Sequence, residues 1–304
     1  NPTAKRLFRW EGRFLEGKYF LNEIPEILSN DLHTNIESIL NREKEKDDLR
    51  FSLGEPARTL RIVLQSVLDT NKVELKGIAV TIQDLTREVE LNAAQNRFIS
   101  NVSHELRTPL ASIIGFIETI QGHAKNDKAN RELFLSMMHD QAVRMQRLVD
   151  DLLSLSKLEL QENSPPSSDC NVYQIIDKIV KSFLPLAKKY KVKLINNLPL
   201  NLSKIIGDET QMQQLYSNLI ENALKYSGEK SEIQIELVKN QKNRKSNNNM
   251  IGIQIIDNGK GIPTEHIYRL TERFYRVNAD LSRERQGTGL GLSIVKRIIE
   301  DHGG

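Results

Sequence analysis

The sequence predicts a multidomain α+β protein, and three stretches of the chain carry this prediction. Residues 58–69 and 73–86 alternate apolar and polar side chains, which is typical of strands. Further on, apolar residues recur every three or four positions over two long runs, as they do in amphipathic helices. The last part alternates helical and strand patterns behind a stretch rich in proline and serine. At 304 residues, the chain suits two or three domains.

The composition is that of a soluble globular protein, with 38% hydrophobic and 27% charged residues. The net charge of +3 leaves no nucleic-acid-binding footprint, so we expect no nucleic-acid partner. The single cysteine, Cys170, cannot form an intramolecular disulfide, which favours a reducing compartment. No apolar run approaches the roughly 20 residues of a membrane helix. The chain opens at Asn1 without a methionine and ends on "DHGG", so we expect a fragment, and any membrane anchor would lie outside it.

Residues 1–86 are expected to form a small α+β module. The turn residues Asp69, Thr70 and Asn71 separate the two strand patterns, which therefore predict an antiparallel hairpin. Residues 41–50 hold charges of both signs, and we expect them to be a solvated charged run.

Residues 87–163 predict two long helices joined by a polar turn at 122–130. The apolar positions of the two helices are Phe98, Val102, Leu106, Leu110, Ile113, Ile117 and Ile120, and then Phe134, Met138, Ala142, Met145, Val149, Leu152 and Leu155. A lone helical hairpin leaves part of this apolar surface in water, and pairing with a second copy into a four-helix bundle would cover it. We therefore expect a homodimer.

Residues 164–304 are expected to form the third domain. The stretch "ENSPPSSDC" at 162–170 is a linker by composition. The patterns beyond it predict helix 171–190, strand 191–196, helix 208–226, strands 231–239 and 250–257, and a final helix after Gly291.

The first long helix displays a histidine, His104, on its outward face. His104 is two residues from Leu106 and so lies about 200° around the helix from this apolar position. Thr108, four residues on, shares the face of His104, and Pro109 should bend the helix because it has no N–H to donate. A neutral exposed imidazole is a nucleophile, and Glu105 beside it can accept or orient a ring proton. The alternative is an ordinary surface histidine, which is our expectation for the others: His33, His123, His139, His266 and His302.

The stretch "NVSHELRTPLASI" at 101–113 resembles the phosphoacceptor box of bacterial two-component sensor histidine kinases. By this resemblance, His104 is the autophosphorylated residue and Glu105 its acid–base partner. The resemblance also implies that Thr108 positions water against a phosphorylated partner, which would be a phosphatase activity.

Four pieces of the last domain suggest a nucleotide site. Asparagines four residues apart share a helix face in "NLIENALKYS" (218–227), and amide oxygens suit Mg²⁺. In "IIDNGKGI" (255–262), an aspartate ends a strand and glycines follow that allow close backbone approach. The third piece, "ERFYRVN" (272–278), is aromatic and basic, and the fourth, "GTGLGLSIVKRIIE" (287–300), runs a glycine loop into a helix N-terminus that favours phosphate.

In this order, the four pieces resemble the N, G1, F and G2 boxes of the Bergerat-type ATP-binding fold, an α/β sandwich. The resemblance implies ATP and Mg²⁺ as cofactors, with Asn222 as the Mg²⁺ ligand, Asp257 at the adenine and 264–286 as a mobile lid. The implied ATP-binding residues are Asn218, Asn222, Lys225, Tyr226, Asp257, Gly259, Gly261, Phe274, Arg276, Gly287, Thr288, Gly289, Leu290 and Gly291. Family members carry a further strand pair after the "HGG" that ends this chain, so the domain is expected to be C-terminally truncated, with an uncovered sheet edge.

The front module resembles a PAS sensor domain. "AVTIQDLTRE" (79–88) is similar to its closing strand and exit, and "NPTAKRLF" (1–8) to an early segment, which implies that the first strand is missing. The alternative is a small α+β dimerisation piece with no ligand. Residues 86–97 would couple this module to the helical hairpin.

The sequence therefore predicts an ATP-dependent protein-histidine kinase that passes phosphate from His104 to an aspartate of a response-regulator receiver domain. One alternative is an ATPase of the chaperone or topoisomerase type, but this needs a glutamate where the chain has Asn218. Another is a non-catalytic sensor that acts mainly as a phosphatase. The run that begins "GFIETIQGHA" is most similar to phosphate-regulon sensors. We expect these domains to be cytoplasmic and the full-length protein to be anchored in the bacterial inner membrane.

Overall fold

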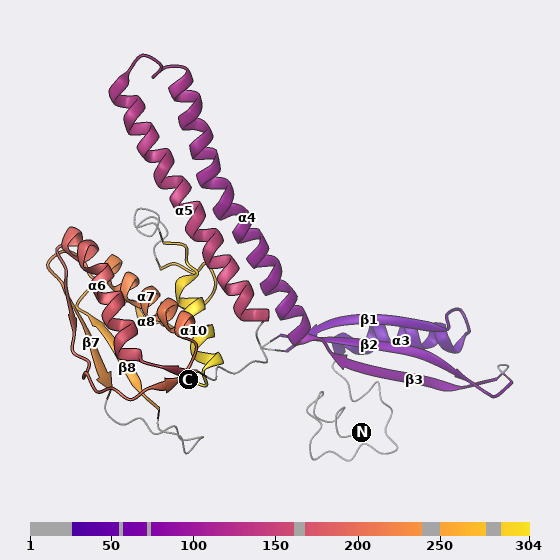
Figure 1. Ribbon diagram of the computed structural model, residues 1–304. Helices are drawn as coiled ribbons and strands as arrows, with labels where there is room; N and C mark the ends of the chain where they lie inside the picture. Colours follow the sequence, from indigo (N-terminus) through magenta and orange to yellow (C-terminus); the bar gives the residue numbers. More distant parts are fainter. Residues whose placement is uncertain (1–25, 55–56, 72–73, 161–167, 239–249, 278–286) are drawn as a thin grey trace. The chain divides into compact units, whose positions relative to one another are not determined.

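The computed structural model describes residues 26–54, 57–71, 74–160, 168–238, 250–277 and 287–304 (Figure 1). The chain divides into two units, Asn1–Ile99 and Ser100–Gly304, which are described separately below. The early PAS-like segment predicted at 1–8 and the end of the predicted lid, 278–286, lie outside the described residues. None of the described helices combines the length and the apolar character that a bilayer span requires.

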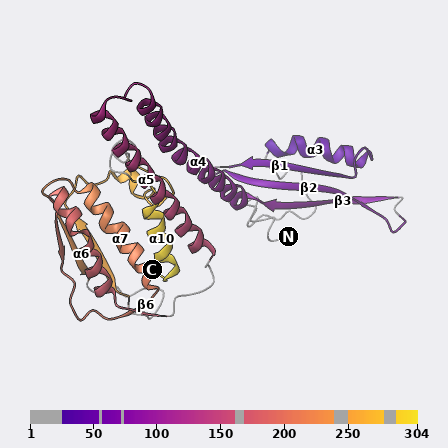
Figure 2. The same ribbon diagram turned by 45° about the horizontal axis from the view of Figure 1, so that its top comes forward.

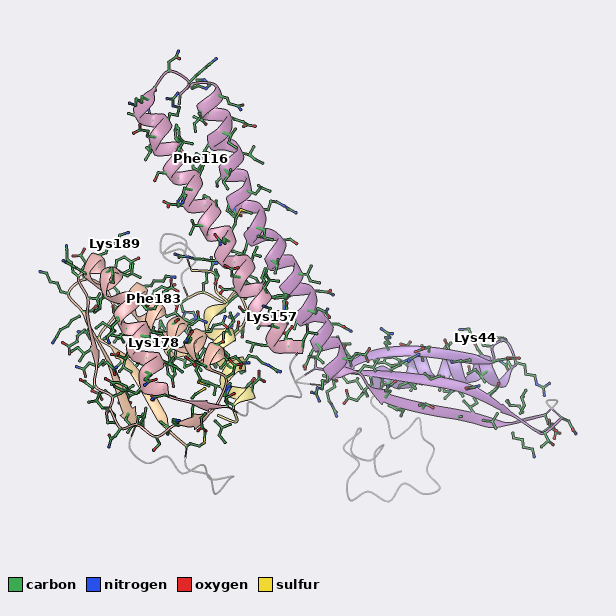
Figure 3. All side chains as sticks on the ribbon, in the orientation of Figure 1. Lys44, Phe116, Lys157, Lys178, Phe183 and Lys189 are labelled. Atoms are coloured by element: carbon green, nitrogen blue, oxygen red, sulfur yellow. The ribbon has the colours of Figure 1, made fainter. Side chains whose placement is uncertain are left out.

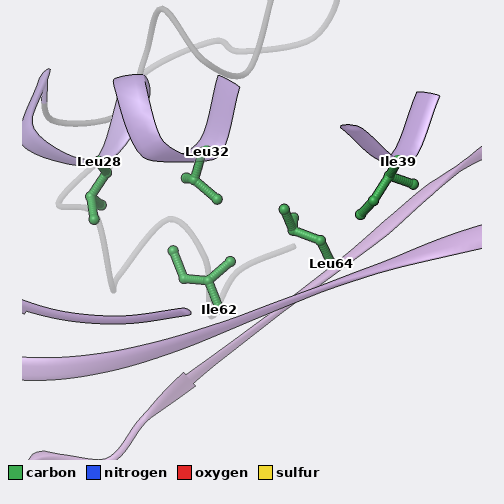
Figure 4. Packing of buried hydrophobic residues seen from close by; sticks show 5 residues of the cluster. All are labelled: Leu28, Leu32, Ile39, Ile62 and Leu64. Atoms are coloured by element: carbon green, nitrogen blue, oxygen red, sulfur yellow. The ribbon is translucent and has the colours of Figure 1, made fainter. Parts of the chain in front are cut away.

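The first unit is a three-stranded antiparallel sheet with a helix on one face (Figure 2). Its elements are helix α3 (Glu26–Leu40) and strands β1 (Lys46–Leu53), β2 (Arg58–Leu68) and β3 (Leu75–Asp84), in the order β1-β2-β3. The core forms where Leu28, Leu32 and Ile39 of α3 meet Ile62 and Leu64 of β2, all at most 1% exposed (Figure 4). The predicted hairpin of β2 and β3 is confirmed, with Ile62 opposite Ile82.

Strand β1 differs from the expectation for the charged run 41–50. The charges of this run are solvated, but its second half belongs to a strand that pairs with β2. Leu49, Phe51 and Leu53 lie on the face that packs against the core, whereas Asp48 and Arg50 lie on the opposite face. The alternation of apolar and polar residues that marks a strand is hard to see in this sequence, because charged residues occupy the outward-facing positions.

The second unit contains the predicted helical hairpin. Helix α4 (Thr86–Gln121) reaches into it from the first unit, and helix α5 (Lys128–Leu160) follows the turn. The ring of Phe116, labelled in Figure 3, stacks on that of Phe134 with centroids 5.7 Å apart, and this contact joins the two helices. Pro109 lies buried within α4, which continues through it. Large apolar side chains remain exposed on both helices: Leu110, Ile114, Ile117, Leu133, Leu135, Met137, Val149 and Leu153.

The rest of the second unit is a lobe of helices over a mixed sheet. The sheet has the order β5-β7-β8, with β5 (Lys193–Asn196) parallel and β8 (Gly252–Asp257) antiparallel to β7 (Glu232–Val238). Helices α6 (Val172–Tyr190) and α7 (Glu209–Tyr226) lie on the same side of the sheet, and α10 (Gly291–Asp301) packs beside α7 (Figures 1 and 2). Within the described residues β8 is an edge strand of this sheet.

Short elements complete the lobe and correct the sequence predictions. The predicted linker 162–170 ends in strand β4 (Asp169–Cys170), which pairs with an unpredicted strand, β6 (Ile205–Ile206). Helix α8 (Thr264–Ile267) lies in the predicted lid. Strand β5 begins at Lys193 rather than 191, because Lys191 takes a left-handed conformation (φ 57°) that ends α6.

Candidate functional site

His104 is exposed on α4, as the helical phase predicts. It lines an open pocket of about 540 Å³ together with Arg107, Thr108, Ala111 and Ser112. All five side chains come from α4 within little more than two turns. The imidazole is therefore accessible to a macromolecule or to a nucleotide.

The backbone below His104 departs from ordinary helical bonding. The hydroxyl of Thr108 donates to the carbonyl oxygen of His104 at 3.2 Å, and that of Ser112 donates to the carbonyl of Thr108 at 3.1 Å. Side-chain bonds of this kind add to or compete with the helix ladder, and Pro109 leaves the Glu105 carbonyl without an N–H donor. In this arrangement the Thr108 hydroxyl donates to the backbone, so it can hold a water as an acceptor and must rotate to donate to one.

Among the described residues no hydrogen bond joins Glu105 to the imidazole of His104, and two arginines hold its carboxylate instead. Oε2 accepts from Nη2 of Arg144, on α5, at 3.1 Å and from Nη2 of Arg276 at 3.0 Å. The side chains of Glu105, Arg144 and Arg276 are 20%, 13% and 9% exposed, so these are partly desolvated, charge-assisted contacts. The acid–base role of Glu105 stays a prediction.

Helix α7 places Asn218, the first of the predicted N-box residues, against the start of α10. Its apolar face, which includes Met212, Leu215 and Ala223, is buried in the lobe. The Nδ2 of Asn218 lies 3.5 Å from the carbonyl oxygen of Gly291, a long hydrogen bond to the start of α10.

The other predicted polar residues of α7 follow on the same helix. Asn222, one turn beyond Asn218, is half-buried. Lys225 forms an ion pair with Glu221 at 2.9 Å, and Tyr226 is 44% exposed at the end of the helix. Amide oxygens and an ammonium group on one helix face suit a hydrated Mg²⁺ and phosphate oxygens.

The end of β8 brings Asp257 close to the end of α7. Asp257 is exposed, and its Oδ1 accepts the N–H of Gly259 at 2.8 Å. A Cβ on Gly259 would lie 3.0 Å from the carbonyl oxygen of Tyr226 and 3.0 Å from the Cα of Ser227. Only glycine permits this approach, and Gly261 (φ 71°) also needs glycine's conformational freedom.

The predicted F and G2 boxes meet directly. The N–H of Phe274 donates to the carbonyl of Gly289 at 2.8 Å, and a Cβ on Gly289 (φ 78°) would lie 2.9 Å from the Cα of Phe274. Arg276 donates through Nη2 to the carbonyl of Thr288 at 3.0 Å. The loop that contains Gly287 therefore rests on the lid residues before it enters α10, whose N-cap residue, Leu290, makes no side-chain capping bond.

Hairpin residues also reach this loop. The hydroxyl of Thr288 donates to Oδ2 of Asp151, on α5, at 2.7 Å, and Arg273 pairs with Glu159. Burial raises the pKa of the Asp151 carboxyl more than the Thr288 bond lowers it. The groups of the site fit a nucleotide: amide oxygens can bind Mg²⁺, an exposed carboxylate can accept a hydrogen bond from an amine, and N–H groups at the start of α10 can donate to phosphate.

Sequence reasoning missed three residues of this region. Arg144 and Asp151 lie on the predicted second helix, but nothing near them in sequence marks their partners. His302, expected to be an ordinary histidine, donates from Nδ1 to the carbonyl of Ile298 at 2.7 Å and accepts the N–H of Asp208 at its Nε2 at 3.1 Å. The position of His302 in the "HGG" motif at the end of the chain was the sequence feature that could have indicated a structural role for it.

Comparisons with known proteins match two stretches of the chain. Residues 94–161 match the His Kinase A (phospho-acceptor) domain, and residues 207–304 match the histidine kinase-, DNA gyrase B-, and HSP90-like ATPase family. Together these matches include both the exposed histidine and the glycine loop.

Similar proteins include two sensors. Drug sensory protein A of Synechocystis sp. is 36% identical over 326 residues, which cover 99% of this chain and 49% of that protein. Sensor protein kinase WalK of Staphylococcus aureus is 31% identical over 304 residues, covering 100% of this chain and 70% of that protein. The chain spans about half the length of the first three relatives. Histidine kinase ThkA, solved in complex with response regulator protein TrrA, aligns over 100% of this chain and 85% of its own with a TM-score of 0.52 and 21% identity, which shows a common fold.

Proposed function

The chain belongs to the bacterial two-component sensor histidine kinases, and on that premise we propose that it phosphorylates its own His104 from ATP and passes the phosphoryl group to an aspartate of a response regulator. The observation that carries this proposal is the combination of an exposed imidazole on α4 with a glycine loop at an uncapped helix start in the same unit. The relatives named above carry other names than phosphate sensor, so that subtype stays a prediction.

The transfer requires a nucleophile, a leaving group and a proton acceptor. An imidazole nitrogen of His104 attacks the γ-phosphorus, the bond from that phosphorus to the β–γ bridging oxygen breaks, and ADP leaves with the electron pair. Bound Mg²⁺ would neutralise phosphate charge, held through Asn222 with support from Asn218. Asp257 would accept a hydrogen bond from the adenine amine, while Lys225 and the 287–291 loop would face phosphates.

Glu105 is the nearest carboxylate in sequence to accept the imidazole proton. Its present bonds to Arg144 and Arg276 hold it on a neighbouring face of α4, so accepting that proton requires the side chain to turn. We propose that Thr108 aids a separate hydrolysis, in which water attacks the phosphorus of a phosphorylated regulator, the aspartate leaves and inorganic phosphate forms, since Thr108 lines the same pocket as His104.

The proposed partners follow from the same surfaces. ThkA was solved with a response regulator, and we propose a receiver domain as the partner that docks at the open pocket of α4. A second copy of the chain would cover the exposed apolar side chains of the hairpin. Membrane anchoring remains a proposal about the full-length protein.

Labelled ATP tests the proposal. Incubation with γ-labelled magnesium–ATP should give a phosphoprotein whose label is lost in acid and survives base, because a phosphoramidate is acid-labile. His104→Ala should abolish labelling and His139→Ala, a change at an exposed α5 histidine, should not. Asn222→Ala and Asp257→Ala should abolish ATP binding. Acid-stable label would point to serine or threonine, and ATP turnover without any phosphoprotein would favour the chaperone-type ATPase.

A further inference from the structure

Asp151 is a carboxylate of the hairpin that the proposed phosphotransfer does not use. It lies on α5, which packs against α10, and its Oδ2 accepts the hydroxyl of Thr288 at 2.7 Å. The same hydroxyl lies 3.3 Å from the N–H of Leu290, from which it accepts. Through Thr288, an acidic side chain is therefore connected to the start of α10.

The glycine loop is held on two sides. Asp151 binds the side chain of Thr288, while Arg276 binds its carbonyl oxygen at 3.0 Å and also pairs with Glu105. Both attachments lead to the hairpin, one to α5 and one to α4. Thr288 thus joins the loop to the helices that display His104.

Charged groups on two helices surround Asp151. Glu221 of α7 and Asp150 of α5 oppose its ionised form, and Lys225 favours it. Burial opposes the ionised form most strongly, and raises the pKa of Asp151. The carboxylate lies beside the helix start where phosphate would bind, so a triphosphate would bring further like charge to this place.

We propose that Asp151 is a latch residue, which ties the 287–291 loop to the hairpin when no nucleotide is bound and is displaced when phosphates enter. The proposal rests on the proposed function, because it takes the loop as the phosphate site. The carboxylate acts in two ways: it engages the Thr288 hydroxyl, and it repels an incoming phosphate. Nucleotide binding would therefore release the loop from α5, and tighter docking of the loop would weaken nucleotide binding.

Two substitutions separate these effects, and a third is the control. Asp151→Asn removes the charge but keeps an oxygen acceptor, and Asp151→Ala removes both. Asp150→Asn makes the same charge change one residue away, on an exposed position of α5. We expect both Asp151 variants to bind magnesium–ATP about three-fold to about 20-fold more tightly, a range that brackets the about five-fold effect of two unit charges about 4 Å apart in water-like surroundings. The gain should be smaller for AMP, which brings less charge.

Calorimetric titration of the 304-residue chain measures these affinities, and hydrogen exchange without nucleotide supplies a second reading. The amides of residues 288–292 should exchange faster in Asp151→Ala than in Asp150→Asn. The latch is wrong if Asp151→Asn binds ATP within two-fold of Asp150→Asn, or more weakly, or gains equally for AMP. If the unsubstituted chain binds no ATP, the proposed function itself fails. If it binds ATP, but the Asp151 and Asp150 variants have the same ATP affinity, only the latch proposal fails.

Discussion

Gly259 decides how closely the strand end that carries Asp257 approaches the end of α7. A Cβ at this position would lie 2.7 Å from Oδ1 of Asp257 and 3.0 Å from the carbonyl oxygen of Tyr226. The second contact is with backbone, which cannot rotate away as a flexible side chain does. The glycine therefore serves the geometry of the site, while other glycines of the chain, such as Gly77, have open space around them.

Replacing Gly259 by alanine should weaken nucleotide binding at least about ten-fold, because Asp257 must move by several tenths of an ångström and its orientation decides its bond to adenine. Titration with magnesium–ATP measures this. Gly77→Ala, on β3 with nothing within 4 Å of the added carbon, is the matched control and should leave the affinity unchanged. Equal affinities for the two variants would show that the close approach at Gly259 has no bearing on nucleotide binding.

At the scale of elements, the sequence predicts the helices well and their partners poorly. Both hairpin helices and α6, α7 and α10 are predicted from periodicity because each is long. Strand β1 is missed, because charged residues in it obscure the alternating pattern of a strand. Strand β6 and helix α8 are also missed, because they are too short to show any periodicity.

Contacts between elements depend on register, which no local pattern contains. Phe116 and Phe134 lie equally far from residue 125, so the hairpin turn centres there. The same register places Glu105 near Arg144. This pairing can be predicted only when the centre of the turn is known. Motif residues such as Asn218 and Gly291 could be predicted to meet because a family resemblance supplies the fold; Asp151 lies outside every motif, and its contact with Thr288 could not.

The start of α7 is secured by two bonds at Asp208, which makes it a test of this element. Its Oδ1 caps the helix by accepting the N–H of Gln211 at 2.9 Å. Its own N–H donates to Nε2 of His302, the C-cap residue of α10. Asp208→Ala removes the cap and should cost about 1 kcal/mol of stability, lowering the thermal midpoint of the lobe. Asp208→Asn keeps an equivalent capping oxygen and should remain close to the unsubstituted chain. A lowered midpoint in both variants would instead implicate the carboxylate charge.

At the scale of the whole molecule, the hairpin has more apolar surface than one chain covers. One side of α4 carries Phe98, Val102, Pro109 and Phe116. A second side, about 100° further around the helix, carries Leu110, Ile114 and Ile117. The latter three are 48%, 48% and 37% exposed. His104 and Thr108 occupy a third side. The helix therefore has one face toward α5, an exposed apolar face that we propose for a second copy of the chain, and a third face with the exposed histidine.

A charge within the exposed apolar face should separate the two copies. Burial of a large aliphatic side chain contributes about 1.5–3 kcal/mol, and Ile114→Glu loses this twice in a symmetric dimer and adds two acidic groups to the interface. We expect the unsubstituted chain to sediment as a dimer at micromolar concentration and Ile114→Glu as a monomer, with a dissociation constant raised at least about 100-fold. Ile114→Val keeps the apolar surface and should stay dimeric. A dimer that survives Ile114→Glu would mean that another surface joins the copies, because a face buried between them has no water to solvate the new carboxylates.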